Sequence, residues 1–351
     1  MDGSRLLVGT RKGLFVVDHD GSGWRASAPA FLGDGLSYAA ADPRTGAYWA
    51  CLDHGHWGVK LHRSEDRGAS WDELDVPAYP DGAKVADGSD ATLTYLWTIA
   101  PAGSGEPGRL YAGTEPGGLF VSDDGGASWT LNEPLWNDPT RLTQWFGAGR
   151  DHPGVHSVVV DPRDPDHVLV GVSVAGVFET TDGGENWTPR NVGISSEYLP
   201  DPTSEVGADP HLLVACPSSP DTLWQQNHCG IYRSVDGAAT WHEVSESDGP
   251  ASFGFAIAVD AQDADTAWVV PAISDEQRVA VDGALCVSRT EDGGATWTAF
   301  REGLPQRECF DVTFRHALDV SGDAVAFGTT TGNLYASADR GESWEGVGNH
   351  L

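Results

Sequence analysis

The chain has 351 residues, of which 40% are apolar, and it carries 44 glycines and 21 prolines. This composition is typical of a turn-rich globular protein and argues against a disordered chain. The formal net charge of −31 would repel a nucleic-acid backbone or an anionic membrane, so we expect neither as a partner. No apolar run approaches the roughly 20 residues of a membrane span, the N-terminal residues do not predict a signal peptide, and the five cysteines lack CxxC spacing. These features predict a cytoplasmic protein with free thiols.

The excess of negative charge also bears on habitat. Lysine occurs only at Lys12, Lys60 and Lys84, and carboxylates are spread through the whole chain. The pattern resembles proteins of halophiles that accumulate salt, in which a Debye length of about 3 Å at molar salt screens surface repulsion. We therefore expect a halophilic protein that gains thermal stability in KCl. An acidic surface from an ordinary bacterium with a GC-rich genome is the alternative.

One eight-residue pattern recurs along the chain. Its copies are SEDRGASW (64–71), SDDGGASW (122–129), TTDGGENW (180–187), SVDGAATW (234–241), TEDGGATW (290–297) and SADRGESW (337–344), with a degenerate copy ending at Trp24. The tryptophans follow one another at intervals of 47 to 58 residues, which suits one four-stranded blade per copy. The repeats therefore predict an all-β chain, a seven-bladed β-propeller that occupies residues 1–351 as one domain.

The pattern, here called the box, has a physical reading. Its Ser or Thr and the Asp two residues later can hydrogen-bond the backbone of a turn, its Gly accepts a positive φ, and its Trp offers a large apolar face. These residues resemble the BNR or Asp-box repeat of sialidases and other β-propellers. The resemblance implies antiparallel blades, with each box in the hairpin between the third and fourth strands and opposite the active site. We expect the boxes to be structural.

Apolar alternation between turns predicts an inner strand for six blades. In chain order these strands are 36–41, 95–100, 155–160, 211–215, 253–259 and 310–315. The first blade starts at its second strand, 5–10, and only seven residues follow Trp344. That blade is therefore expected either to have three strands or to lack a C-terminal tail that would complete it.

Long connections are confined to one face of the predicted propeller, and they are residues 75–94, 132–155, 192–210 and 271–283. Insertions on one face mark the binding side of a repeat protein. The second-to-third strand hairpins of that face carry residues that a turn does not need. In chain order they are Arg11 and Lys12, His54 and His56, Glu115, and Gln226, Asn227 and His228, while His156 lies at the entry of an inner strand.

Imidazoles at several points around one channel suit a divalent transition metal. We expect His54, His56, His156 and His228 as its ligands, with Glu115 as a further ligand or as the catalytic base. Arg11, Lys12, Gln226 and Asn227 would bind the substrate. The alternative is that these imidazoles bond only loop backbone and solvent.

Three functions fit this pattern, with a small molecule or a glycan as ligand. The first is a metal-assisted hydrolase or lyase that acts on a small anionic substrate. The second is a glycoside hydrolase in which Glu115 works with Asp53, Glu308 or Asp311. The resemblance implies sialidase chemistry only if three arginines and an Arg-Ile-Pro motif are present, and this chain lacks that motif. The third is a non-catalytic scaffold that presents its channel mouth to another protein, as photosystem assembly factors with similar repeats do.

Overall fold

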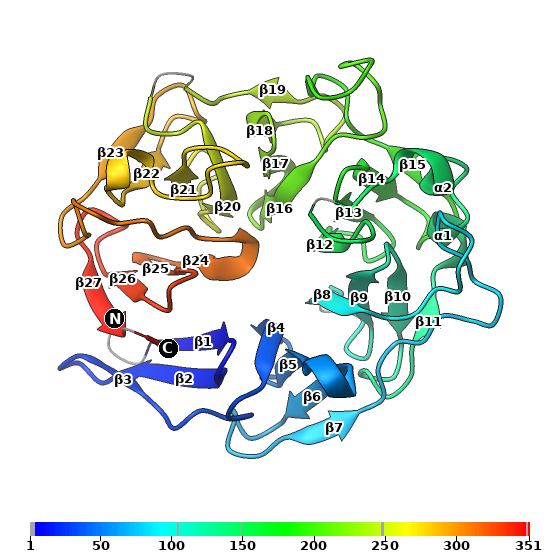
Figure 1. Ribbon diagram of the computed structural model, residues 1–351, viewed down its shortest axis with the longest axis horizontal. Coiled ribbons are helices and arrows are strands. Elements are labelled where there is room, and N and C mark those ends of the chain that lie inside the picture. Colours follow the sequence, from blue (N-terminus) through cyan, green and yellow to red (C-terminus); the bar gives the residue numbers. More distant parts are fainter. Residues whose placement is uncertain (1–3, 104, 148, 247–248, 349) are drawn as a thin grey trace. The chain divides into compact units, whose positions relative to one another are not determined.

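The computed structural model describes residues 4–103, 105–147, 149–246, 249–348 and 350–351. The strands of this part of the chain form seven antiparallel sheets, six with four strands and one with three. Each sheet follows the chain from one edge to the other without a crossover (Figure 1). The protein is therefore a seven-bladed β-propeller, as the repeat spacing predicts.

The chain divides into two compact units, which we describe separately. The N-terminal unit, Asp2–Pro189, holds four sheets, and the C-terminal unit, Arg190–Leu351, holds three.

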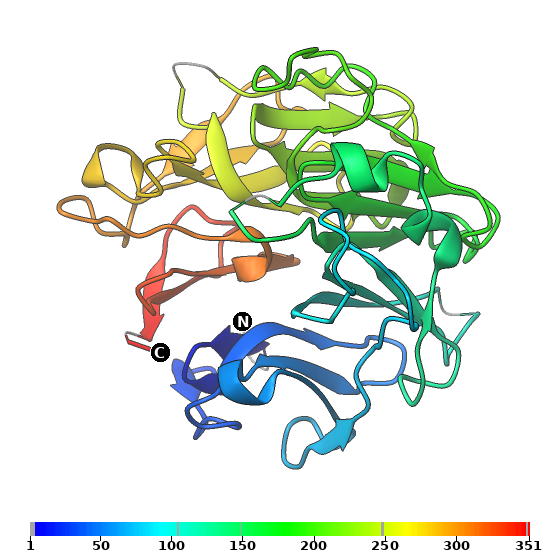
Figure 2. The ribbon, with the colours of Figure 1, turned by 45° about the vertical axis from the view of Figure 1, so that its right-hand side comes forward.

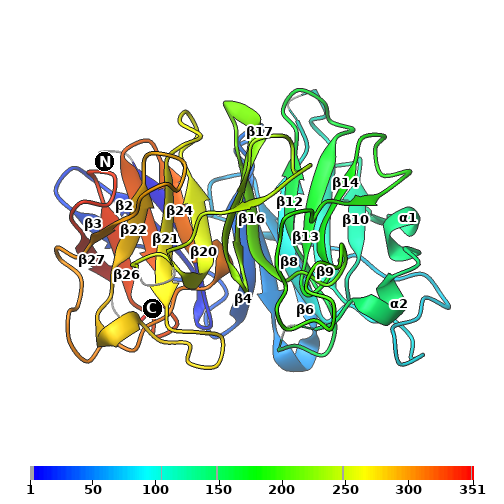
Figure 3. The ribbon, with the colours of Figure 1, turned by 90° about the horizontal axis from the view of Figure 1, so that it is seen from above.

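The strands of the N-terminal unit are short. They are β1 (Arg5–Thr10), β2 (Gly13–His19), β3 (Trp24–Ala26), β4 (Gly35–Ala41), β5 (Tyr48–Asp53), β6 (Val59–Ser64), β7 (Asp72–Leu74), β8 (Tyr95–Pro101), β9 (Leu110–Glu115), β10 (Leu119–Ser122), β11 (Thr130–Leu131), β12 (Val155–Val160), β13 (Val168–Val172), β14 (Gly176–Thr180) and β15 (Thr188–Pro189). The short helices α1 (Glu133–Trp136) and α2 (Arg141–Gln144) lie beside β10 and β14 (Figures 1 and 3). Trp136 of α1 packs there in a buried cluster with Phe120 and Leu131.

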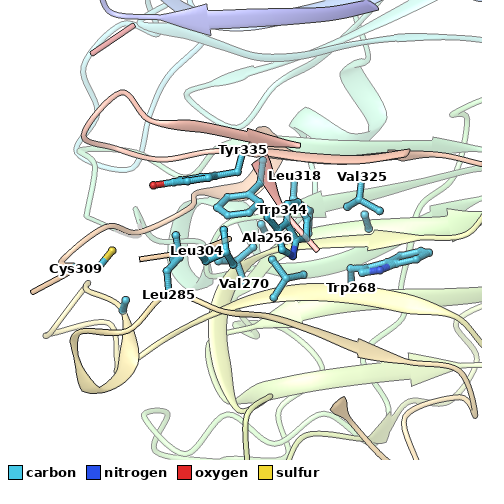
Figure 4. Close-up of a cluster of buried hydrophobic side chains, with 14 residues drawn as sticks. Ala256, Trp268, Val270, Leu285, Leu304, Cys309, Leu318, Val325, Tyr335 and Trp344 are labelled. Atoms are coloured by element: carbon cyan, nitrogen blue, oxygen red, sulfur yellow. The ribbon is translucent and has the colours of Figure 1, made fainter. Parts of the chain in front are cut away.

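The strands of the C-terminal unit are β16 (Pro210–Cys216), β17 (Ser219–Asn227), β18 (Gly230–Ser234), β19 (His242–Glu243), β20 (Phe253–Val259), β21 (Ala267–Ala272), β22 (Val287–Thr290), β23 (Thr298–Phe300), β24 (Leu318–Ser321), β25 (Ala324–Gly328), β26 (Leu334–Ser337) and β27 (Glu345–Gly348). Apolar side chains of the last two sheets meet in a buried cluster that includes Trp268, Leu318 and Trp344 (Figure 4). Such a cluster supplies the apolar burial that a single four-stranded sheet cannot achieve alone.

The first sheet has three strands, in the order β1–β2–β3. This is one of the two arrangements expected from the position of Arg5–Thr10 in the sequence. Among the described residues, no fourth strand joins this sheet.

The predicted inner strand of the last sheet is wrong. Residues 310–315 alternate in polarity as a strand does, but the ladder with β25 is formed by β24, in which Leu318 pairs with Phe327. The 310–315 segment is instead held by side-chain bonds, because the Asp311 carboxylate accepts hydrogen bonds from Thr331 Oγ1 (2.7 Å) and Asn333 Nδ2 (2.9 Å).

All six complete boxes form the same hydrogen-bonded turn. In the first, Ser64 Oγ accepts the Gly68 N–H (2.8 Å), and the Asp66 carboxylate accepts bonds from the backbone and the hydroxyl of Ser70 (2.8 and 2.6 Å). Equivalent bonds recur in the other five boxes. Each turn joins the third and fourth strands of its sheet, as the sequence predicts.

Antiparallel order places the connections at two ends of the strands. One end holds the boxes, and we call it the box end. The other end holds the second-to-third strand hairpins and the connections between sheets, and we call it the loop end. None of the helices in the described residues has the length and apolar character needed to cross a bilayer. All five cysteines are free thiols.

Candidate functional site

Two of the predicted metal ligands lie in the β5–β6 hairpin at the loop end. His54 precedes the 3-10 turn η1 (Gly55–Trp57), the blue coil of Figure 2, and His56 lies within it. His54 Nε2 lies 3.1 Å from Asp34 Oδ1, so this imidazole already faces a carboxylate. The ring of His56 packs edge-on against Trp57, with 4.9 Å between ring centroids. Both imidazoles thus contact residues close to the turn itself.

His156 is fully buried, at 0% exposure. It lies at the start of the β12–β13 ladder, where the register shifts between Val155 and Ser157. Its Nδ1 lies 2.8 Å from Ser157 Oγ, and its ring packs 6.4 Å from that of Trp97. Among the described residues, His54, His56 and His156 belong to no group of three or more ligand-type side chains within 4.8 Å of one another. The structure thus gives each of these three imidazoles different neighbours, and metal binding by them stays a prediction.

The predicted substrate-binding pair Arg11 and Lys12 forms the β1–β2 turn, and both side chains are exposed. The turn is fixed locally, since Thr10 Oγ1 accepts the Lys12 N–H at 3.0 Å. Both cations are accessible to an anion at the loop end, and their role in binding remains a prediction.

Glu115 is the last residue of β9 and is 2% exposed. Its carboxylate forms an ion pair with Arg150 and accepts the backbone N–H of His152. Burial raises the pKa of Glu115 above its usual value, although Arg150 opposes this shift. A buried carboxyl group with a raised pKa in a connecting-loop region is the type of group that performs acid or base catalysis.

Two aromatic rings accompany Glu115, because the ladder pairs Tyr95 of β8 with Glu115. The Tyr95 and Trp97 rings lie 4.6 Å apart, and both are partly exposed. The Arg150 guanidinium lies 4.3 Å from the Tyr95 ring centroid and 5.5 Å from that of Trp97. We call Glu115, Arg150, Tyr95 and Trp97 the Glu115 site. Sequence reasoning found Glu115 but missed Arg150, whose connection carries no repeated pattern.

In the C-terminal unit, Gln226 and Asn227 are buried in the β17–β18 hairpin rather than exposed to a ligand. Asn227 Oδ1 accepts the Cys229 N–H (3.0 Å), and its Nδ2 donates to Gln225 Oε1 (3.0 Å). Gln226 Nε2 donates to the Gly230 carbonyl (3.3 Å). These bonds give both amides a part in shaping the hairpin, and a contact with substrate remains a prediction.

His228 lies at the tip of the same hairpin and meets two side chains that the sequence did not single out. Asp209, His211 and His228 each offer a ligand atom, and these atoms lie within 4.8 Å of one another. Among the described residues this is the one such group, and we call it the Asp209 cluster. Strand register explains the meeting, because Pro210 pairs with Asn227 and the His228 N–H donates to the Asp209 carbonyl (2.9 Å).

The other carboxylates weighed as partners of Glu115 differ in their surroundings. Asp53 ends β5 at the loop end of the N-terminal unit and is exposed. Glu308 is exposed in the C-terminal unit, and Asp311 there is buried and bonded to Thr331 and Asn333. Asp53 is therefore the candidate that shares both a unit and a strand end with Glu115.

Comparison with known proteins gives distant relatives. No family model matches the chain. The chain is 27% identical over 236 residues to a xyloglucanase of Paenibacillus sp, an alignment that covers 58% of this chain and 22% of that protein. It is 25% identical over 262 residues to a probable oligoxyloglucan-reducing end-specific xyloglucanase of Neosartorya fischeri, covering 67% of this chain and 30% of that protein. The alignments thus span no more than 30% of the length of these two relatives.

Solved structures share the fold. An ancestral GH74 enzyme superposes with a TM-score of 0.63 at 17% identity, over 90% of this chain and 38% of that one. YCF48 bound to D1 peptide superposes with a TM-score of 0.56 at 15% identity, over 89% of this chain and 80% of that one. At these identities the likeness concerns the β-propeller fold alone.

Proposed function

We propose that this protein is a glycoside hydrolase that acts on a xyloglucan-type glycan, with Glu115 as its general acid. Two observations support the proposal. The curated relatives described above are xyloglucanases, and Glu115 is a buried carboxyl group with a raised pKa at the loop end. The metal-assisted hydrolase or lyase that the sequence put first finds no support among these relatives, so the glycoside-hydrolase alternative replaces it.

The buried state of Glu115 carries the proposal. A glycosidase acid must hold its proton near the working pH, and burial disfavours the charged carboxylate. Arg150 works in the opposite direction, because its guanidinium favours the charged carboxylate. Burial and the ion pair thus act on the pKa of Glu115 in opposite directions. The partly exposed rings of Tyr95 and Trp97 offer an apolar surface beside it.

Glycoside hydrolysis also needs a second carboxylate. We assign this role to Asp53, because β5 packs beside β8 and both Asp53 and Glu115 end their strands at the loop end. The Asp53 carboxylate is exposed whereas Glu115 is buried, and this difference in surroundings suits a base or nucleophile opposite an acid.

The test measures the release of reducing ends from xyloglucan oligosaccharides, with unbranched glucan oligosaccharides in parallel. We expect Glu115→Gln to lower kcat by about 10²–10⁴-fold, the usual contribution of a general acid, and to leave the substrate affinity measured by calorimetry nearly unchanged. Asp53→Asn should also lower kcat strongly. The control is Glu185→Gln, which removes an equal charge from an exposed position in a box.

The outcomes separate clearly. Hydrolysis by the parent protein that disappears in Glu115→Gln and survives in Glu185→Gln supports the proposal. A Glu115→Gln variant that hydrolyses at the parent rate overturns the assignment of the acid, and failure of the parent protein to bind or cleave any of these glycans overturns the proposed function.

A further inference from the structure

We infer that Asp209, His211 and His228 bind one divalent transition-metal ion, with zinc as the ion that best fits the set. Two imidazoles and one carboxylate form a ligand set that suits zinc and other first-row metals, whereas calcium and magnesium prefer oxygen ligands alone. The site is in the C-terminal unit and shares no residue with the Glu115 site.

The spacing leaves room for an ion. His211 Nε2 and His228 Nδ1 lie 3.7 and 3.9 Å from the same oxygen, Asp209 Oδ2. These separations are too long for hydrogen bonds. With zinc bonds of about 2.0–2.1 Å, two ligand atoms of a tetrahedral site stand roughly 3.3 Å apart, so small side-chain shifts would close the three groups on one ion.

His211 is oriented as a metal ligand. Its Nδ1 lies 2.7 Å from the Gly254 carbonyl oxygen, which can only accept a hydrogen bond, so Nδ1 must carry the proton. In the neutral ring the lone pair is therefore on Nε2, the nitrogen that faces Asp209. The ring is held in this position by stacking on Phe255, with 4.7 Å between centroids. A backbone carbonyl that fixes the tautomer in this way is the usual support of a ligating histidine.

His228 has a carboxylate near each of its two ring nitrogens. Its Nδ1 faces Asp209, and its Nε2 lies 3.9 Å from Asp275 Oδ2. The imidazole packs edge-on against Tyr198, at 5.0 Å between centroids, and against Phe253, at 6.2 Å. At 3.9 Å this pair forms no hydrogen bond, but a small side-chain shift would let Asp275 accept the Nε2–H and raise the basicity of the ring, as carboxylates beside metal-bound histidines do.

The Asp209 cluster is buried on one side and partly exposed on the other, which suits the binding of an ion from solution. Asp209 and His211 are buried, and a carboxylate in that setting is stabilised by a cation placed against it. His228 and Tyr198 are partly exposed, so the ion can enter from the solvent side and water can complete its coordination. Of the four histidines that the sequence predicts as metal ligands, His228 is the one that belongs to the Asp209 cluster.

The experiment titrates the chelator-treated full chain with Zn²⁺ by calorimetry and with Co²⁺ by visible absorption, with Mg²⁺ and Ca²⁺ in parallel. We expect one Zn²⁺ or Co²⁺ per chain, a Co²⁺ ligand-field spectrum, and no comparable binding of Mg²⁺ or Ca²⁺. His228→Ala should weaken Zn²⁺ binding by at least about 100-fold, and Asp275→Asn by about 10-fold.

His242→Ala is the matched control, since His242 is an exposed histidine of the same unit on β19. It should bind Zn²⁺ as the parent does. Because His211 is buried and its removal can disturb folding, His228→Ala is the deciding variant, with near-UV circular dichroism to show that it remains folded. A parent protein that binds no Zn²⁺ or Co²⁺, or a His228→Ala variant with the parent's affinity, would overturn the inference. Either result leaves the test of Glu115 unaffected.

Discussion

The two ends of the strands are built by different kinds of interaction. At the box end, the defining bonds join residues four positions apart, such as Ser64 to Gly68 and Asp66 to Ser70, and six copies repeat them. At the loop end, Glu115 meets Arg150 across 35 residues, and His211 meets Gly254 across 43. Local, repeated bonds therefore define the blades, while contacts distant in sequence and present once assemble the candidate sites.

The largest expected effect concerns the tryptophans of the box end. Trp241 is 2% exposed, and its Nε1 donates to the Arg190 carbonyl (2.8 Å). Trp241→Ala should lower the free energy of unfolding by about 3–5 kcal/mol, because it leaves a cavity and removes the hydrogen bond to the Arg190 carbonyl. Urea unfolding measures the change.

Trp187 provides the comparison, since it occupies the same position in another copy of the box. Its side chain is only half-buried, so Trp187→Ala should cost less than Trp241→Ala. Trp57→Ala, at a loop-end position that is 69% exposed, should leave the free energy of unfolding nearly unchanged. Equal losses in all three variants would show that the boxes do not stabilise the blades in the way described.

The sequence predicted the box end well because the bonds that define it are local and repeated. Ser, Asp, Gly and Trp within eight residues determine a turn without help from the rest of the chain, so six copies could be recognised by inspection. The inner strand of the last sheet was misplaced because 310–315 alternates as a strand does, while its partners Thr331 and Asn333 lie some 20 residues away.

The sites were predicted less completely. Glu115 and His228 were found because their hairpins contain residues that a turn does not need. Asp209 and His211 were missed although strand register could have shown them, since a residue just before β16 must face the residue just after β17. Arg150 gave no signal, because its position depends on a long connection whose path the sequence pattern does not determine.

The next largest effect tests how neighbouring blades constrain the boxes. Gly126 has a φ of 86°, and a Cβ added there would lie 2.7 Å from Trp49 Cη2. Gly126→Ala should therefore cost about 2–3 kcal/mol, from the left-handed backbone and the crowding of Trp49.

Ala238 shows that the left-handed backbone alone does not account for the expected destabilisation by Gly126→Ala. It occupies the same box position with a φ of 67° and is accommodated. Gly346→Ala is the control, because a Cβ there meets nothing within 4 Å. If thermal unfolding found Gly126→Ala as stable as Gly346→Ala, the packing of this box against Trp49 would be wrong.

A smaller effect comes from carboxyl groups whose pKa values shift in opposite directions at the two ends. Hydrogen bonds from Ser70, Ser128 and Asn186 lower the pKa of Asp66, Asp124 and Asp182 from 3.8 to about 2. Their contribution to stability is thus present above about pH 4 and is lost as the pH falls toward 2. Glu115 has a raised pKa, so its contribution is greatest below its unfolded value and declines as the pH rises through the folded pKa.

Carboxyl NMR titration of the folded protein measures both shifts. Arg150→Gln should raise the pKa of Glu115 further, since the guanidinium favours the charged form, and should not change the box aspartates. The alkaline limb of the kcat/KM profile should move to higher pH in the same variant, because the acid then keeps its proton longer. A limb that stays in place would separate Glu115 from the proton transfer.

The most direct test of the division between the two ends is the kcat/KM of Glu115→Gln on xyloglucan oligosaccharides, expressed per folded molecule and set beside that of Trp241→Ala. The account predicts that Glu115→Gln loses at least about 100-fold in kcat/KM, whereas Trp241→Ala keeps the parent value in its folded fraction. A Glu115→Gln variant with the parent's kcat/KM would contradict the claim that catalysis resides at the loop end on this carboxyl group.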